Sequence, residues 1–194
     1  MNPSLDQLCA QFGRLIGPGS TVGSVGPALA AGPGSPSGLP TSGSPTAAAP
    51  ALPAVASGEG RAPAPIQRTD HAAKGYDLDV AVAPLQVVMA AEILDRSGFG
   101  LDAVTGVDWL AQGQMEVVYD YFHPVAPLRV VVRTRVPRER PEVPTITGIF
   151  PGANWHERET HDFFGLVFAG HPDLKPLLLP EDATFHPLRK DYQP

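Results

Sequence analysis

Cysteine is almost absent from this chain: Cys9 is the only one among 194 residues. A single thiol cannot form an internal disulfide framework, and this chain alone cannot ligate an iron–sulfur cluster. The sequence also contains no GxGxxG dinucleotide fingerprint and no GxxxxGK[ST] phosphate loop. These absences argue against several common redox and nucleotide-binding sites.

Long apolar runs are absent as well. The longest, residues 80–91, is interrupted by Pro84 and Gln86 and falls short of the roughly 20 residues that span a bilayer. The N-terminus has no basic region before an apolar core, and it carries Asp6 and only Arg14, so we expect neither a secretory signal nor a transit peptide. The formal net charge of −6 does not support nucleic-acid binding. We expect a cytosolic protein, free or docked to something larger.

Charge is missing from one long segment. Residues 17–58 contain no charged side chain and consist mostly of Gly, Pro, Ser, Ala and Thr. This composition offers too little bulky apolar surface to offset the entropy of ordering the chain. We therefore predict a disordered linker over residues 17–74, a folded domain over residues 75–166 and an extended docking tail over residues 167–194.

Helical and strand periodicity is present on both sides of this linker. Before it, apolar spacing predicts an amphipathic helix over residues 1–16, with Ser4 as N-cap and Gly17 as the stop. After it we expect a helix opened by Pro84 and a final helix that ends at Gly165. Strands are expected over residues 76–82, 101–109, 114–123 and 128–136. This order predicts an α+β fold: a mostly antiparallel sheet of about four strands, with helices packed on one face.

The segment WHERETHDFFG, residues 155–165, places many ionisable side chains among bulky apolar ones. Burying Trp155 beside charges requires paired partners, because an unpaired buried charge costs several kcal/mol. Arg158 and Asp162 are four residues apart on the predicted helix and can pair. Together with Glu159 they share a face with Trp155. Such a face suits a protein–protein contact with complementary ion pairs.

The same segment could instead carry chemistry. His156 and His161 are five residues apart, about 140° around a helix, so they do not converge on a metal ion as in a zinc hydrolase. Only Glu157 and His161 share a face. Glu157 with Glu159, or His161 with Asp162, could act as acid and base, but no nucleophile motif accompanies them. A metal-dependent hydrolase is the alternative of another class, and no catalytic, metal or cofactor-binding residue is assigned.

Two further segments are charged. The tail is rich in proline and closes with HPLRKDY, residues 186–192, whose arginine favours bidentate carboxylate partners. A solvated terminus is the alternative for this block. A long tail with little structure of its own is unusual in a compact domain, so we expect it to lie along another protein. An arginine run is expected to be a solvated edge; it comprises Arg133, Arg135, Arg138 and Arg140.

These motifs together resemble a known family. This family is the C subunit, or 30 kDa subunit, of the bacterial proton-pumping NADH:quinone oxidoreductase (respiratory complex I). Its signature is similar to residues 150–180, FPGANWHERETHDFFGLVFAGHPDLKPLLLP, followed by HPLRKDY. The family's central strands are similar to TGVDW, residues 105–109, and MEVVYDYF, residues 115–122. His161 departs from the signature, since members more often carry an aromatic residue there. The resemblance implies partner-docking roles for Trp155, Glu157, Arg158, Glu159, Asp162, Phe164, Gly165, His171, Pro172, His186, Pro187, Leu188, Arg189, Lys190 and Asp191.

The resemblance also implies a function. This chain would be a cofactor-free structural subunit of the peripheral arm, supporting electron transfer from NADH to quinone coupled to proton translocation. The D subunit of that complex, which helps form the quinone site, would be its principal partner, beside neighbouring iron–sulfur subunits, with FMN and the iron–sulfur clusters held by partners. It would be peripheral to the bacterial inner membrane on its cytoplasmic side. The alternative in the same class is the homologous subunit of a membrane-bound nickel–iron hydrogenase or a ferredoxin-linked complex.

Overall fold

The structure, a computed structural model, describes residues 3–17 and 65–193. The predicted linker over residues 17–74 therefore lies mostly outside the described residues. In its last part, β1 (Ile66–Arg68) and α2 (His71–Lys74) occupy residues that the sequence assigns to the linker. The linker prediction is wrong there, because elements this short show no hydrophobic periodicity.

The N-terminal helix α1 (Leu5–Ile16) has the two caps expected from the sequence. The Ser4 hydroxyl accepts the N–H of Gln7, and the Gln7 side chain accepts the N–H of Ser4, both at 3.2 Å. The helix ends at Gly17, whose φ of 66° favours glycine. Its apolar stripe is buried in the same core as the sheet and consists of Leu8, Phe12 and Ile16.

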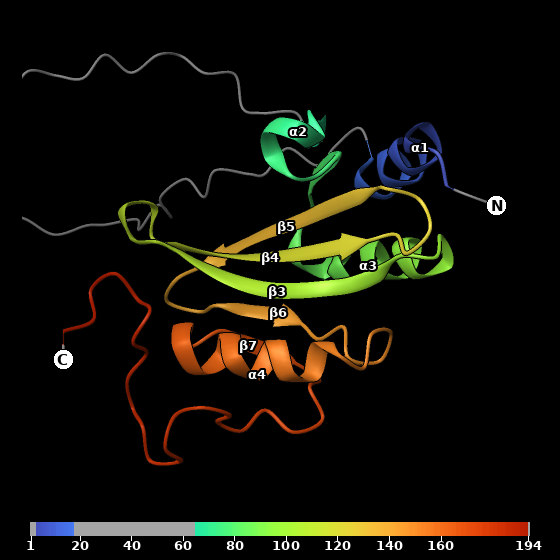
Figure 1. The fold of residues 1–194 in the computed structure, drawn as a ribbon. Helices are drawn as coiled ribbons and strands as arrows, with labels where there is room; N and C mark the ends of the chain where they lie inside the picture. The colour runs from blue at the N-terminus through green and yellow to red at the C-terminus, as the bar shows by residue number, and fades with distance from the viewer. Residues whose placement is uncertain (1–2, 18–64, 194) are drawn as a thin grey trace, which may run out of the picture. The chain divides into compact units, whose positions relative to one another are not determined.

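Five strands form one sheet in the order β1-β2-β5-β4-β3 (Figure 1). The pairing of β2 with β5 is parallel, and every other pairing in this sheet is antiparallel. The predicted α+β class and mostly antiparallel sheet are confirmed, with β1 as a fifth strand that the sequence did not reveal. The other strands are β2 (Leu78–Ala81), β3 (Gly100–Trp109), β4 (Gln114–Phe122) and β5 (Arg129–Pro137).

One face of this sheet is covered by helices. The short 3₁₀ turn η1 (Pro84–Gln86) leads into α3 (Val87–Arg96), which lies behind the strands in Figure 1. Every second residue of a strand points to this face. Tyr119 on β4 and Val132 on β5 are examples, and they pack with the helices in one apolar core. The buried residues of α3 are Val87, Ala90, Ala91 and Leu94.

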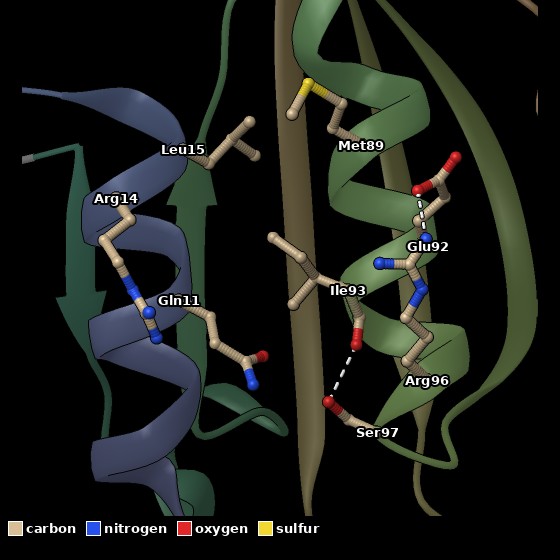
Figure 2. A pocket seen from close by; sticks show the side chains of 8 residues that line it. All are labelled: Gln11, Arg14, Leu15, Met89, Glu92, Ile93, Arg96 and Ser97. Atoms are coloured by element: carbon tan, nitrogen blue, oxygen red, sulfur yellow. Dashed lines mark hydrogen bonds and ion pairs between the residues drawn. The ribbon is translucent and has the colours of Figure 1, made fainter.

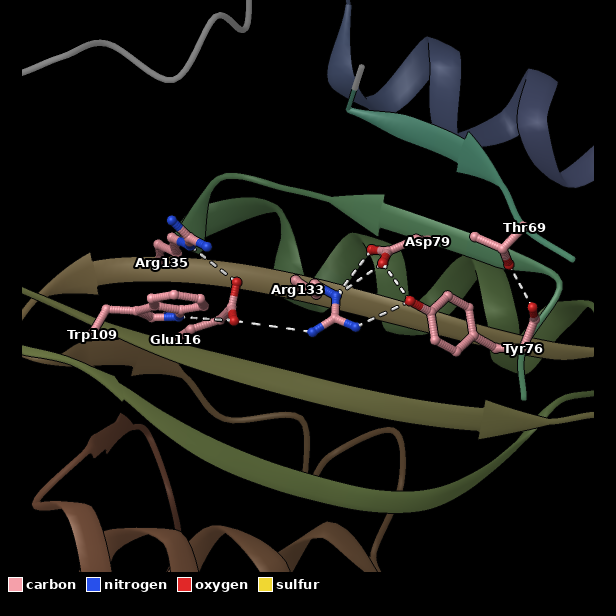
Figure 3. Close-up of polar contacts among 7 residues, drawn as sticks. All are labelled: Thr69, Tyr76, Asp79, Trp109, Glu116, Arg133 and Arg135. Atoms are coloured by element: carbon pink, nitrogen blue, oxygen red, sulfur yellow. Dashed lines mark hydrogen bonds and ion pairs between the residues drawn. The ribbon is translucent and has the colours of Figure 1, made fainter. Parts of the chain in front are cut away.

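The other face of the sheet carries a network of charged side chains (Figure 3). Arg133 donates to Asp79 at 3.0 Å, and Arg135 donates to Glu116 at 3.0 Å. The indole N–H of Trp109 donates to the second oxygen of Glu116 at 3.0 Å. The prediction of a simple solvated edge is therefore wrong for these arginines, because each has a carboxylate partner on a neighbouring strand.

The residues after β5 form a second group of elements. The strand β6 (Glu142–Pro144) pairs in parallel with β7 (Val167–Ala169), and α4 (Ala153–Phe164) connects them. The helix α4 packs on the edge strand β3, whose link to β4 is the turn η2 (Leu110–Gln112). Among the described helices, none is both long and apolar enough to cross a bilayer.

Candidate docking surface

The helix α4 approaches β3 at van der Waals distance through one glycine. A Cβ on Gly106 would lie 2.5 Å from Cδ2 of Phe164, so no larger residue fits there without displacing the ring. Next along the same contact, the Thr160 hydroxyl is shared between the carbonyl of His156 on α4, at 2.7 Å, and that of Val104 on β3, at 3.2 Å. These contacts fix α4 against the sheet and orient the charged motif that it carries.

The two charges expected to pair on α4 bind the tail instead. Arg158 donates to the backbone carbonyls of Lys175 and Pro176, both at 3.0 Å. One carboxylate oxygen of Asp162 accepts three consecutive backbone N–H groups, those of Leu177, Leu178 and Leu179, at 2.7, 2.8 and 3.2 Å. The prediction of an Arg158–Asp162 pair is wrong, because the tail supplies better partners to both.

These three donors also set the charge state of Asp162. Burial alone would raise the pKa of this carboxyl, but the hydrogen bonds from the tail outweigh burial and lower it. Asp162 is therefore an anion that binds one turn of the tail to α4. In the structure it bonds to groups of its own chain.

Glu157 is fully buried, with 0% of its surface exposed. One carboxyl oxygen accepts the N–H of Ile146 at 2.9 Å and the other accepts the hydroxyl of Thr145 at 2.5 Å. Burial raises the pKa of Glu157 to about 7, although these two hydrogen bonds act in the opposite direction. The side chain therefore joins α4 to the segment after β6, and it cannot reach a partner directly.

The basic motif at the end of the tail caps α4. The last carbonyls of a helix have no partner within the helix and need donors from outside. His186 Nδ1 donates to the carbonyl of Asp162 at 2.8 Å, the N–H of Leu188 donates to Phe163 at 3.1 Å, and Arg189 Nε donates to Phe164 at 2.7 Å. The HPLRKDY motif thus completes a helix of its own chain.

Gly165 allows this arrangement. Its φ of 71° is in the left-handed region, and a Cβ there would lie 2.5 Å from both the Arg189 guanidinium and the His186 ring. The predicted site residues Gly165, His186 and Arg189 are therefore brought together, and they form the C-terminal cap of α4.

The last charged residues of the tail reach the sheet. Asp108, at the end of β3, accepts two hydrogen bonds from Arg138 at 3.0 and 3.2 Å and the backbone N–H of Lys190 at 2.9 Å. Arg138 in turn pairs with Asp191. Burial would raise the pKa of Asp108, but these donors outweigh it and lower the pKa. The tail is fixed at both ends on its own domain, which the sequence did not predict, and the expectation that it lies along another protein stays a prediction.

Other predicted site residues remain at the surface. Trp155 is 61% exposed, with the Arg158 guanidinium 5.5 Å from its ring centre, and Glu159 is exposed one turn further along α4. Pro172 is also exposed, whereas Phe164 and Pro187 are partly buried. In the tail, the large exposed apolar side chains are Val167, Leu178, Phe185 and Leu188.

His171 is partly buried in the turn that starts the tail. Its Nδ1 accepts the N–H of Asp173 at 3.1 Å, so its Nε2 carries the proton and points to the carbonyl of Asn154 at 3.4 Å. Burial lowers the pKa of this imidazole. His161, the residue that departs from the family signature, donates from Nδ1 to the carbonyl of Leu166 at 2.7 Å.

No metal centre forms among the residues that the structure describes, since no three His, Cys, Asp or Glu side chains gather in a suitable geometry. Gly106, Asp108 and Thr145 are also parts of this region, and none of them was predicted as a site residue from the sequence. For the first two a signal existed: a glycine inside a strand marks a close approach, and both residues lie in the TGVDW motif. Thr145 gave no such signal, because its partner is distant in the sequence.

Comparisons with known proteins agree with this architecture. The family model described as "Respiratory-chain NADH dehydrogenase, 30 Kd subunit" matches residues 80–194. This chain belongs to that family. The matched residues include the end of β2, the strands that follow it, α4 and the whole tail.

Individual relatives support the same family. The C subunit of NADH-quinone oxidoreductase from Roseiflexus sp. is 44% identical over 121 residues, covering 59% of this chain and 69% of the relative. The C subunit of F(420)H(2) dehydrogenase from Methanosarcina mazei is 42% identical over 97 residues, covering 48% of this chain and 60% of the relative. The solved structure of an archaeal membrane-bound sulfane sulfur reductase contains a chain that matches with a TM-score of 0.56 and 30% identity, covering 60% of this chain and 71% of that chain.

Proposed function

We propose that this chain is a structural subunit of an NADH–quinone oxidoreductase, in which it docks to the D subunit within the peripheral arm. The observation that carries the proposal is the tail fixed on α4. Arg158, Asp162 and Arg189 bond to backbone groups of this chain, while Trp155, Leu178 and Leu188 are exposed by 53–61%. Large apolar side chains on a rigid support are typical anchors of a protein–protein interface.

The proposal assigns no reaction to this chain alone. Its buried carboxyl groups, those of Glu157 and Asp162, accept hydrogen bonds from the chain itself. In this proposal FMN and the iron–sulfur clusters belong to partner subunits, and the chain is peripheral to the inner membrane on its cytoplasmic side. The neighbouring iron–sulfur subunits are further partners.

A second candidate is a related membrane complex fed by another electron donor. It is favoured by the similarity to the F(420)H(2) dehydrogenase chain and to the sulfane sulfur reductase chain. Purification of the native assembly separates the two. Subunits that carry FMN, together with NADH:quinone activity, support the first proposal. A partner with nickel-ligating CxxC pairs, or turnover only with another electron donor, contradicts the first proposal and supports the second. Turnover by the purified chain alone contradicts both proposals.

The docking surface can be tested with neighbouring substitutions on α4. We expect Glu159→Ala and Trp155→Ala to lower co-purification with the D subunit while the melting temperature of the isolated chain stays unchanged, because both side chains are exposed. Arg158→Ala removes two hydrogen bonds to the tail. We expect it to lower the free energy of unfolding by about 1–2 kcal/mol, and the melting temperature with it. Unchanged co-purification of both surface variants would contradict the proposed interface.

A further inference from the structure

A groove lies between α1 and α3, and it is separate from the α4 surface. The helix α1 contacts β1, one edge of the sheet, whereas α4 contacts β3, the opposite edge. The groove has a volume of about 450 Å³. Its apolar lining comes from both helices and consists of Leu15, Met89 and Ile93 (Figure 2).

One polar atom in this groove has no partner. The side-chain oxygen of Gln11 is buried, yet nothing donates a hydrogen bond to it. In Figure 2 the Gln11 amide points from α1 toward the gap between the helices. Leaving a buried acceptor unsatisfied costs on the order of 1–3 kcal/mol, so a donor from outside this chain would relieve a real cost.

The rim of the groove is positively charged. Arg96 is paired with Glu92 at 2.8 Å, but Arg14 donates only to the carbonyl of Ala10 and has no carboxylate partner within the described residues. The net charge of these three side chains at the rim is therefore +1. In addition, Met89 is 55% exposed, and Leu85, four residues before it, is 83% exposed.

We propose that this groove binds an amphipathic helix of a neighbouring polypeptide. That helix would place an apolar stripe between α1 and α3, a side-chain N–H or O–H on Gln11, and a carboxylate beside Arg14. Helices commonly bind such grooves through residues spaced by three and four positions.

Two other occupants fit the groove less well. Residues 18–64 of this chain contain one acidic side chain, Glu59, which stands between two glycines, so they offer no helix with a carboxylate for Arg14. A second copy of the same groove would place one positive rim against another, which costs energy. The partner is therefore a different chain with an acidic flank, and this inference does not depend on which protein α4 contacts.

Photo-cross-linking in the assembled complex tests the proposal. The full chain carries p-benzoylphenylalanine in place of Met89, and the cross-linked peptide is identified by mass spectrometry. We expect a peptide of another polypeptide with helical apolar spacing and at least one Asp or Glu. A cross-link to this chain itself, a cross-link to a second copy, or the absence of any cross-link would overturn the proposal.

Two substitutions provide matched readouts. Arg14→Glu is expected to lower the cross-link yield by about fivefold or more. Arg140→Glu, the same charge change at a side chain that is 87% exposed in the turn before β6, is expected to leave the yield unchanged. Equal effects of the two changes would count against the groove.

Gln11→Leu separates binding from folding. It removes an unsatisfied buried acceptor, so the melting temperature of the full chain alone should stay constant or rise while the cross-link yield falls. A lower melting temperature with an unchanged yield would show that Gln11 serves only the packing of α1, and would contradict its role in binding.

Discussion

At the scale of single residues, Glu157 shows how a charged motif can lie inside a protein. Its carboxyl group is enclosed by the core and faces no cation among the described residues, so the neutral form is favoured. The two hydrogen bonds from Thr145 and Ile146 hold it in one orientation. This residue connects α4 to the segment after β6, and it does so at a measurable cost in stability.

That cost predicts a pH dependence. The pKa of Glu157 is raised from 4.5 to about 7 in the folded chain, so between these values the folded chain holds a proton that the unfolded chain has released. The free energy of unfolding is therefore expected to fall as pH rises from about 4.5 to about 7, by roughly 3 kcal/mol, and to stay constant above that range.

Urea unfolding of two glutamine variants measures this effect. Glu157→Gln keeps an acceptor for the N–H of Ile146 and should remove the slope between about pH 4.5 and 7. Glu159→Gln, at an exposed position two residues away, should keep it. If the free energy of unfolding of Glu157→Gln falls with pH as steeply as that of the wild-type chain, Glu157 is not the group that causes the pH dependence.

At the scale of elements, the close contact between α4 and β3 depends on Gly106. Adding one methyl group there would place it 2.5 Å from the Phe164 ring. We expect Gly106→Ala to lower stability by about 1–3 kcal/mol in thermal unfolding, because the ring has to leave its place beside the strand.

Gly148 provides the control for this contact. An added Cβ there has no atom within 4 Å, so Gly148→Ala should change stability little. The double variant Gly106→Ala with Phe164→Leu should recover part of the loss, since the shorter side chain leaves room for the methyl group. Similar losses for both alanine variants would show that the glycine matters for its backbone and not for the space it leaves.

Elements also show what the sequence could and could not predict. Periodicity located α1 and the strands β3, β4 and β5, because their burial patterns are local. It missed β1, which has three residues and exists through pairing with β2. It also missed the partners of Arg158 and Asp162, since these are backbone groups of the tail rather than side chains. Backbone partners leave no mark in the sequence.

At the scale of the whole molecule, α1 completes the core. Phe12 is fully buried, with 0% of its surface exposed, in a core whose other members come mostly from residues 78–168. We expect Phe12→Ala to cost about 3–5 kcal/mol. Gly13→Ala, at the next position and with free space around it, should be neutral or stabilising by up to about 1 kcal/mol. Chemical denaturation of both full-length variants measures the difference, and equal stabilities would mean that α1 is not part of the core in solution.

The cap that residues 186–189 place on α4 has a consequence for synthesis. The ribosome joins residues 186–189 to the chain after the whole of α4, so until then the last carbonyls of the helix lack these donors. The end of the helix and the Asp108 cluster can close only after translation has passed residue 190. In a nascent chain the sheet can therefore form before the cap on α4 exists.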